Sequence, residues 1–164
     1  YYEGPARSSI LRYKFGGKRN YAKCYGRLLA MKIQEDHPDG FDLLTWVPTA
    51  PLRKLARGYD HAELIAEAAA EELGIKPVRL LKKIRNNHPQ SGVAGQAQRR
   101  ANVLGVYRVC PGVELTEKKI LLIDDVITTG ATAGEAARML LTAGGEQVHC
   151  AAMALARRGG KRSR

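Results

Sequence analysis

The stretch that decides the fold runs from Lys118 to Thr132 and reads KKILLIDDVITTGAT. Its residues 120–123 are an unbroken run of large aliphatic side chains, which is typical of a strand buried on both faces of a parallel sheet. Asp124 and Asp125 follow at the carboxyl end of this strand, and open α/β sheets bind their ligands at that edge. The stretch therefore predicts a buried strand that delivers two carboxylates to a ligand site.

A turn of small and hydroxyl-bearing residues follows the acid pair and leads into a predicted helix that ends at about Ala143. The turn consists of Thr128, Thr129, Gly130, Ala131 and Thr132. Free backbone amides and the positive end of the helix dipole predict an anion site there. Adjacent carboxylates repel each other, so they need hydrogen-bond donors or a metal to stay ionised together. A ribose diol would supply such donors while the turn binds the 5′-phosphate of the same sugar.

Other kinds of site also place aspartates after a strand. Receiver-type magnesium pockets and nucleotide-hydrolase strands do so, and many strand ends carry an aspartate only to cap the next helix. These alternatives do not account for the hydroxyl-rich turn at 128–132. The chain has no Gly-Lys-Ser/Thr ending of a Walker A loop and no Gly-x-Gly-x-x-Gly fingerprint, which disfavours ATPase and dinucleotide-dependent oxidoreductase functions.

Length and the order of elements bound the architecture. A chain of 164 residues with 45% hydrophobic content buries one core but not two ordinary domains. We therefore expect one domain over residues 1–156 and a basic flexible tail over 157–164. Strand patterns alternate with helix patterns, which predicts an α/β fold with a mostly parallel central sheet flanked by helices. The expected strands are 43–47, 78–81, 103–109 and 147–155, and the expected helices besides the one after the turn are 20–34 and 60–73.

The net charge of +11 is concentrated in two segments. Residues 4–34 and residues 73–113 each contain eight Lys or Arg side chains and no acidic one. A polyphosphate substrate or a nucleic-acid backbone would both suit such segments, and charge alone does not separate them. No apolar run approaches the ~20 residues needed to cross a bilayer, so we expect no membrane segment and a cytoplasmic location.

Several stretches of the chain resemble a known family. IDDVITTGAT, residues 123–132, looks like the phosphoribosyl pyrophosphate (PRPP) binding motif of type I phosphoribosyltransferases. The ComF family is resembled by LRYKFGGKRNYA at 11–22, VPTAPLRKLARGYDHAELIA at 47–66 and PQSGVAGQAQRRANVLGVYRV at 89–109. The resemblance covers nearly the whole chain. ComF proteins resemble amidophosphoribosyltransferases in this domain and are linked to DNA uptake during natural competence.

This resemblance implies a type I phosphoribosyltransferase fold and transfer of the 5-phosphoribosyl group from PRPP to a nitrogen nucleophile, with release of pyrophosphate. Mg²⁺ is the implied cofactor, the acceptor is unidentified, and a homodimer is common among similar proteins. An alternative is an accessory protein of DNA uptake that keeps the fold and binds single-stranded DNA or a competence helicase. The implied site comprises Asp124 and Asp125 for ribose and Mg²⁺, residues 128–132 for the 5′-phosphate, Arg53 and Arg57 for pyrophosphate, and Arg99 and Arg100 as catalytic residues on a lid.

Some of these features also have a structural interpretation. Asp60, followed by Glu63 three residues later, is a capping-box-like start of a helix, and this role competes with ligand contact. The arginines of the proposed lid could instead face solvent or nucleic acid. Tyrosines of the N-terminal arm could stack on bases, but packing of the arm onto the core is favoured. Trp46 is most simply a core residue.

Overall fold

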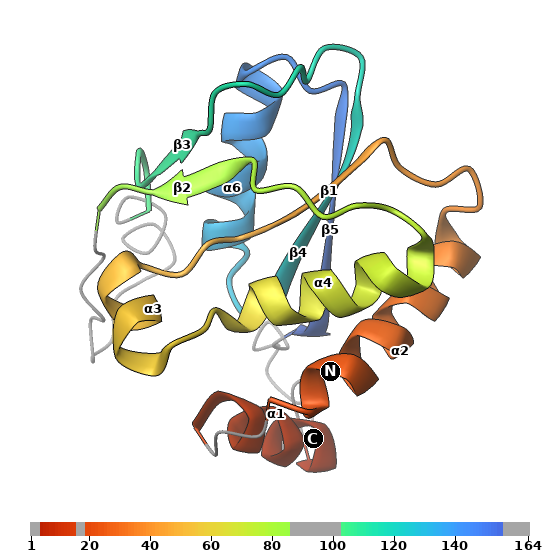
Figure 1. The fold of residues 1–164 in the computed structure, drawn as a ribbon, viewed down its shortest axis with the longest axis vertical. Coiled ribbons are helices and arrows are strands. Elements are labelled where there is room, and N and C mark those ends of the chain that lie inside the picture. Colours follow the sequence, from red (N-terminus) through yellow and green to blue (C-terminus); the bar gives the residue numbers. More distant parts are fainter. Residues whose placement is uncertain (1–3, 16–18, 86–102, 156–164) are drawn as a thin grey trace, which may run out of the picture.

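A parallel three-stranded sheet lies at the centre of the computed structural model, which describes residues 4–15, 19–85 and 103–155 (Figure 1). Its middle strand is β4 (Lys119–Ile127), with β1 (Leu43–Trp46) on one side and β5 (Gln147–Leu155) on the other. Both neighbours run parallel to β4, so the chain crosses over between them through helices. The predicted α/β fold with a mostly parallel sheet is confirmed, and β5 has the predicted bounds.

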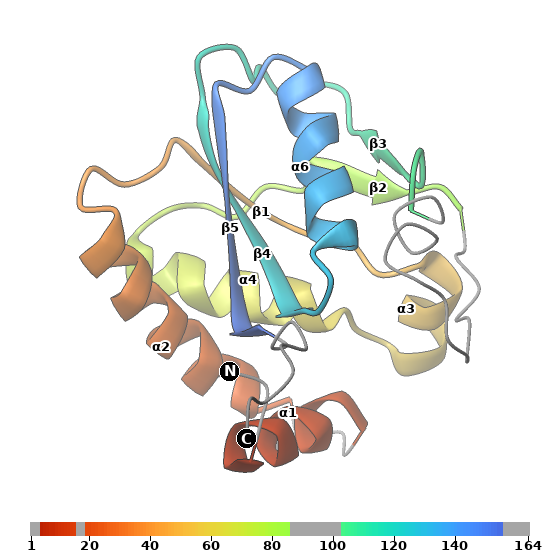
Figure 2. The same cartoon turned by 180° about the vertical axis from the view of Figure 1, so that it is seen from behind.

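Helices cover both faces of this sheet (Figures 1 and 2). One face carries α2 (Tyr21–Asp36) and α4 (His61–Leu73), and the other carries α6 (Ala131–Thr142). Leu121 and Ile123 of β4 pack toward α2 and α4, whereas Ile120 and Leu122 pack toward α6. Side chains alternate between the faces of a strand, so a strand covered on both sides needs an apolar residue at every position. This is why the central run is uninterrupted.

The helices α2 and α4 pack closely because their contact residues are small. A Cβ atom built on Gly26 of α2 would meet the Ala68 Cβ at 2.4 Å and the Ala69 backbone nitrogen at 2.7 Å. Ala66 and Ala69 of α4 are both 0% exposed. The absence of a side chain at Gly26 therefore sets the distance between the two helices.

Two strands begin later than the sequence predicts. β2 (Leu81–Lys83) and β3 (Tyr107–Val109) form a separate antiparallel pair, whereas the patterns predict strands at 78–81 and 103–109. Leu80 donates its N–H to the side-chain oxygen of Thr45 rather than to a strand carbonyl. Gly105 has a left-handed φ of 67° in the turn before β3. Leu80, Val103 and Val106 are buried, so they add to the apolar pattern although they lie outside the two strands.

Two helices occupy segments where the sequence predicts none. α3 (Pro51–Arg57) lies between the predicted strand at 43–47 and the predicted helix at 60–73, and α1 (Gly4–Phe15) forms the N-terminal arm. Proline is at the first helical position of α3, and the helix ends at Gly58, whose φ of 77° is left-handed. Leu52 and Leu55 have the i, i+3 spacing of a helix, but seven residues are too few for this spacing to predict one, and no residue of α3 is buried.

The N-terminal helix α1 packs on the core through Tyr13. This side chain is 1% exposed, and its ring centroid lies 5.5 Å from that of Tyr25 in α2. Packing of the arm onto the core is thus confirmed for Tyr13. Trp46 is 7% exposed, which confirms its assignment to the core.

Two further expectations concern the chain outside this core. In the ranges that the structure describes, no helix is both long and apolar enough to span a membrane. The predicted tail at 157–164 lies outside the described residues.

Candidate functional site

A cavity of about 340 Å³ lies at the carboxyl edge of the sheet, where β1 and β4 end. Its walls come from the end of α1, the segment after β1 that contains α3, the start of α4, and the ends of β2 and β4. Residues distant in the sequence therefore meet there. The charged side chains that line it are Lys14, Arg53, Arg57, Lys83, Asp124 and Asp125.

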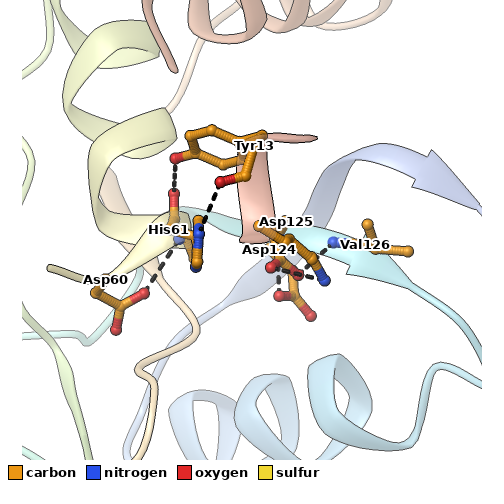
Figure 3. A network of polar contacts seen from close by, with 8 residues as sticks. Tyr13, Asp60, His61, Asp124, Asp125 and Val126 are labelled. Carbon is orange, nitrogen blue, oxygen red and sulfur yellow. Dashed lines mark hydrogen bonds and ion pairs between the residues drawn. The ribbon is translucent and has the colours of Figure 1, made fainter. Parts of the chain in front are cut away.

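The acid pair lies within the last residues of β4, since the strand continues to Ile127. Asp124 accepts a hydrogen bond at Oδ1 from the backbone amide of Asp125 at 2.8 Å (Figure 3). Asp125 accepts one at Oδ1 from the backbone amide of Val126 at 2.6 Å. Lys14 Nζ lies 2.8 Å from the other oxygen of Asp125. The backbone thus holds one oxygen of each carboxylate, and the second oxygen of Asp125 contacts a cation.

Burial raises the pKa of Asp124 to about 8, and the negative charge of the adjacent Asp125 adds to the shift. Lys14 acts in the opposite direction, but its effect is smaller. In the ligand-free protein at neutral pH, the neutral form of Asp124 is therefore favoured. A ligand that donates hydrogen bonds or brings a cation would favour the ionised form and release the proton.

The contribution of Asp124 to the free energy of unfolding should fall as the pH rises from about 4 to about 8. The pKa of Asp124 in the folded state lies above its unfolded value, so the folded protein binds the extra proton in this range and loses stability as pH rises. Asp124→Asn cannot ionise and should remove this slope, which is at most about 1.4 kcal/mol per pH unit for one proton. Urea unfolding of both proteins at several pH values would measure the difference, and parallel stability curves would contradict the prediction.

Four cations line the same cavity as the acid pair. Arg53 and Arg57 come from α3, Lys83 from the end of β2, and Lys14 from α1. Burial lowers the pKa of Lys83, with a further contribution from Arg53, and its ammonium lies 5.6 Å from the centre of the Tyr107 ring. Four cations exceed two carboxylates, so the cavity favours a ligand with several negative charges.

The hydroxyl-rich turn is divided between two cavities. Thr132 lines the cavity of the acid pair, whereas Thr129, Gly130 and Ala131 line a second cavity of about 370 Å³. Gly130 caps α6 with a left-handed φ of 76°, and Thr129 Oγ1 accepts the Ala131 N–H at 3.4 Å. Thr128 is exposed. Of the five turn residues, the structure brings Thr132 to the acid pair.

Asp60 has the structural role that the sequence suggested. It is 2% exposed, and its Oδ1 accepts the N–H of Ala62 at 3.1 Å at the start of α4. Its other oxygen accepts the N–H of Thr49 at 2.6 Å, on the segment that leads to α3. The helix-cap interpretation is confirmed, and the same carboxylate ties the start of α4 to the wall of the cavity.

The structure also brings residues to the cavity that the sequence did not assign to this site. His61 and Tyr107 line it; they lie in the family-like stretches at 47–66 and 89–109, but neither was assigned a role in the site. Lys14 belongs to the stretch at 11–22, which resembles the ComF family but did not indicate where in the fold this lysine lies. The predicted lid residues Arg99 and Arg100 lie outside the described residues.

The donor set fits Mg²⁺ that arrives with a phosphate ligand. Within residues 4–15, 19–85 and 103–155, no group of three or more His, Cys, Asp or Glu side chains could hold a metal by itself. Asp124 and Asp125 supply carboxylate oxygens, which Mg²⁺ prefers, and this ion usually keeps several waters and substrate phosphates as ligands. The cavity therefore fits a shared ion better than one bound by protein alone.

Comparison with known proteins places this geometry in a family. The phosphoribosyl transferase domain model matches residues 60–164. Competence protein F of Haemophilus influenzae is 26% identical over 154 residues, which cover 90% of this chain and 67% of that protein. Competence protein ComFC of Streptococcus pneumoniae is 31% identical over 140 residues, covering 84% of this chain and 57% of the relative.

Solved structures agree with the sequence comparison. The glutamine PRPP amidotransferase from B. subtilis, complexed with ADP and GMP, is similar with a TM-score of 0.55 at 25% identity. The match covers 82% of this chain and 26% of that one, and the chain spans between about half and two thirds of its curated relatives. From the matched family model, the parallel sheet and the acid pair at its carboxyl edge, it follows that the chain belongs to the phosphoribosyl transferase domain family, as a ComF-type protein with a type I phosphoribosyltransferase fold.

Proposed function

We propose that this protein binds PRPP in the cavity of the acid pair and transfers its 5-phosphoribosyl group to a nitrogen nucleophile. The observation that carries this proposal is that two adjacent carboxylates and four cations line one cavity at the carboxyl edge of the sheet. A pentose with vicinal hydroxyls and several phosphates combines the donors that carboxylates need with the negative charge that cations need.

Each part of the ligand has a matching group in the cavity. The ribose hydroxyls would donate to Asp124 and Asp125, and the 5′-phosphate would lie at the start of α6, near Thr132. Pyrophosphate would lie against Arg53 and Arg57, whose planar guanidinium groups suit phosphate oxygens. Arg99 and Arg100 are proposed to close over the ligand as catalytic residues, and Thr128–Ala131 complete the proposed phosphate turn.

The reaction requires positioning and charge neutralisation rather than a covalent enzyme intermediate. The bond between C1 of ribose and a pyrophosphate oxygen would break as the bond to the acceptor nitrogen forms. Pyrophosphate would leave with the bonding electron pair, and the proton lost by the nitrogen would pass to water. Arg53 and Arg57 would stabilise the negative charge on the departing pyrophosphate. Asp124 and Asp125 would help to hold Mg²⁺, which would supply further charge neutralisation.

Calorimetric titration of PRPP with Mg²⁺ into the purified protein tests the proposal. We expect saturable binding, and we expect ribose 5-phosphate and pyrophosphate each to bind more weakly and to compete with PRPP, because each fills part of the cavity. Release of pyrophosphate in the presence of candidate nitrogen acceptors would then test turnover. Absence of PRPP binding by the folded protein would overturn the proposal.

A second candidate function follows from the basic segments at 4–34 and 73–113. The relatives include competence proteins and a protein named DNA utilization protein YhgH, from Salmonella typhimurium. An accessory protein of DNA uptake would bind single-stranded DNA through Lys and Arg, with an affinity that falls steeply as salt increases. Competition between PRPP and an oligonucleotide would place both in one cleft, whereas independent binding would separate the two functions.

A further inference from the structure

Lys14 contacts the acid pair inside the cavity. Its ammonium lies 2.8 Å from Asp125 Oδ2, and the two side chains are only 25% and 21% exposed. Arg53, Arg57 and Lys83 line the same cavity, yet among the described residues the ion pair with the acid pair comes from Lys14. The remaining oxygen of Asp125 is therefore already occupied by a cation of the chain itself.

The base of this lysine is held in a fixed place by the residue before it. Tyr13 donates from its hydroxyl to the His61 carbonyl at 2.9 Å, and the His61 ring nitrogen Nε2 lies 3.3 Å from the Tyr13 carbonyl (Figure 3). The two rings also pack edge to face with centroids 4.8 Å apart. These reciprocal contacts join α1 to the start of α4, so Lys14 extends into the cavity from a rigid point.

We propose that Lys14 is a tethered counter-ion that sets the affinity of the acid pair for divalent metal and for the phosphate ligand. In the ligand-free protein its ammonium occupies Asp125. When a metal ion or a ribose hydroxyl takes that oxygen, the ammonium moves to the incoming phosphate. The second half of this exchange rests on the proposed function, whereas competition between Lys14 and a metal does not.

Charge and chain length make the exchange physically reasonable. An ammonium and a divalent cation at one carboxylate oxygen repel each other, so a metal ion must displace Lys14 or bind weakly. Lysine has a flexible four-carbon chain, which lets its ammonium move by several ångströms while Tyr13 stays in place. Once displaced, the ammonium remains in a cavity that holds the phosphate groups, and these become its nearest negative charges.

Opposite effects on two ligands follow from this role. Lys14→Met should bind Mn²⁺ alone about tenfold more tightly, because the competing cation is gone, and PRPP with Mg²⁺ about tenfold more weakly, because a phosphate contact is gone. Lys14→Arg should stay close to wild type for both ligands. Arg12→Met is the matched control, since Arg12 is exposed on the same helix and its loss changes the net charge equally.

The first measurement is a titration of Mn²⁺ alone, with free Mn²⁺ followed by electron paramagnetic resonance, on wild type and the three variants. Thermal unfolding checks that each variant is folded, and Lys14→Gln replaces Lys14→Met if the latter does not fold. Tighter Mn²⁺ binding in the Lys14 variant but not in the Arg12 variant supports the proposal. Equal or weaker Mn²⁺ binding by the folded Lys14 variant overturns it.

Calorimetry with PRPP and Mg²⁺ on the same four proteins tests the second half of the exchange. Weaker PRPP binding in Lys14→Met, with restoration in Lys14→Arg, supports transfer of the ammonium to the phosphate. Unchanged PRPP affinity overturns that half. If wild type does not bind PRPP, the proposed function fails, while the Mn²⁺ titration still decides whether Lys14 competes at the acid pair.

Discussion

Replacing Asp124 and Asp125 together by asparagine is expected to weaken PRPP binding about 100-fold or more, because hydrogen bonds to a charged group contribute about 1.5–3 kcal/mol each. Asparagine keeps an oxygen that can accept from the backbone amide in each position, so the local structure should persist. What is lost is the negative charge that receives the ribose hydroxyls and any shared Mg²⁺. Calorimetric titration of PRPP with Mg²⁺ measures the effect.

Stability separates loss of binding from loss of folding in this variant. Burial and repulsion raise the pKa of Asp124, so replacing the pair should leave the free energy of unfolding at about pH 8 unchanged or higher. Asp39→Asn is the matched control, since Asp39 is exposed in the turn after α2 and should not affect PRPP affinity. Wild-type affinity in the folded double variant would show that ribose does not bind at the acid pair.

Gly26→Ala is expected to destabilise the fold by about 2–4 kcal/mol, although alanine is the better helix former. The added methyl group would lie 2.7 Å from the carbonyl carbon of Ala68 and from the nitrogen of Ala69. These are backbone atoms of α4, so no side-chain rotation relieves the overlap. The helices α2 and α4 must separate, which opens the core that both share with β4. Urea unfolding measures the change.

Gly134→Ala provides the matched control for this effect. Gly134 lies inside α6, and a Cβ built there meets no atom within 4 Å. The same substitution should therefore stabilise the protein by about 0.5–1 kcal/mol, since alanine loses less backbone entropy in a helix. Destabilisation of similar size by both substitutions would mean that the close α2–α4 contact is not the cause.

Local sequence pattern was sufficient to predict the elements that are determined by their own residues and nearest neighbours in the chain. The apolar run at 120–123 predicted a strand covered on both faces, and β4 has helices on both sides. The cap at Asp60 predicted the start of α4 to within one residue, because a cap acts through its own backbone neighbours. The motif at 123–132 likewise predicted the fold and the family.

Tertiary contacts decided the rest, because they join residues that no local pattern connects. The helix α3 buries no residue and is too short for its two leucines to establish a helical period. Leu80 is buried with its N–H bonded to the Thr45 side chain of β1, although it lies outside β2. The position of Lys14 against Asp125 depends on how α1 docks on α4 through Tyr13 and His61, whose contacts span 48 residues. Sequence thus determined the carboxylates and the fold that carries them. Only the packing of distant segments determined which cations share the cavity with those carboxylates and which carboxylate oxygen is already paired with Lys14. The reason is that charge and burial at a site depend on all the groups that surround it.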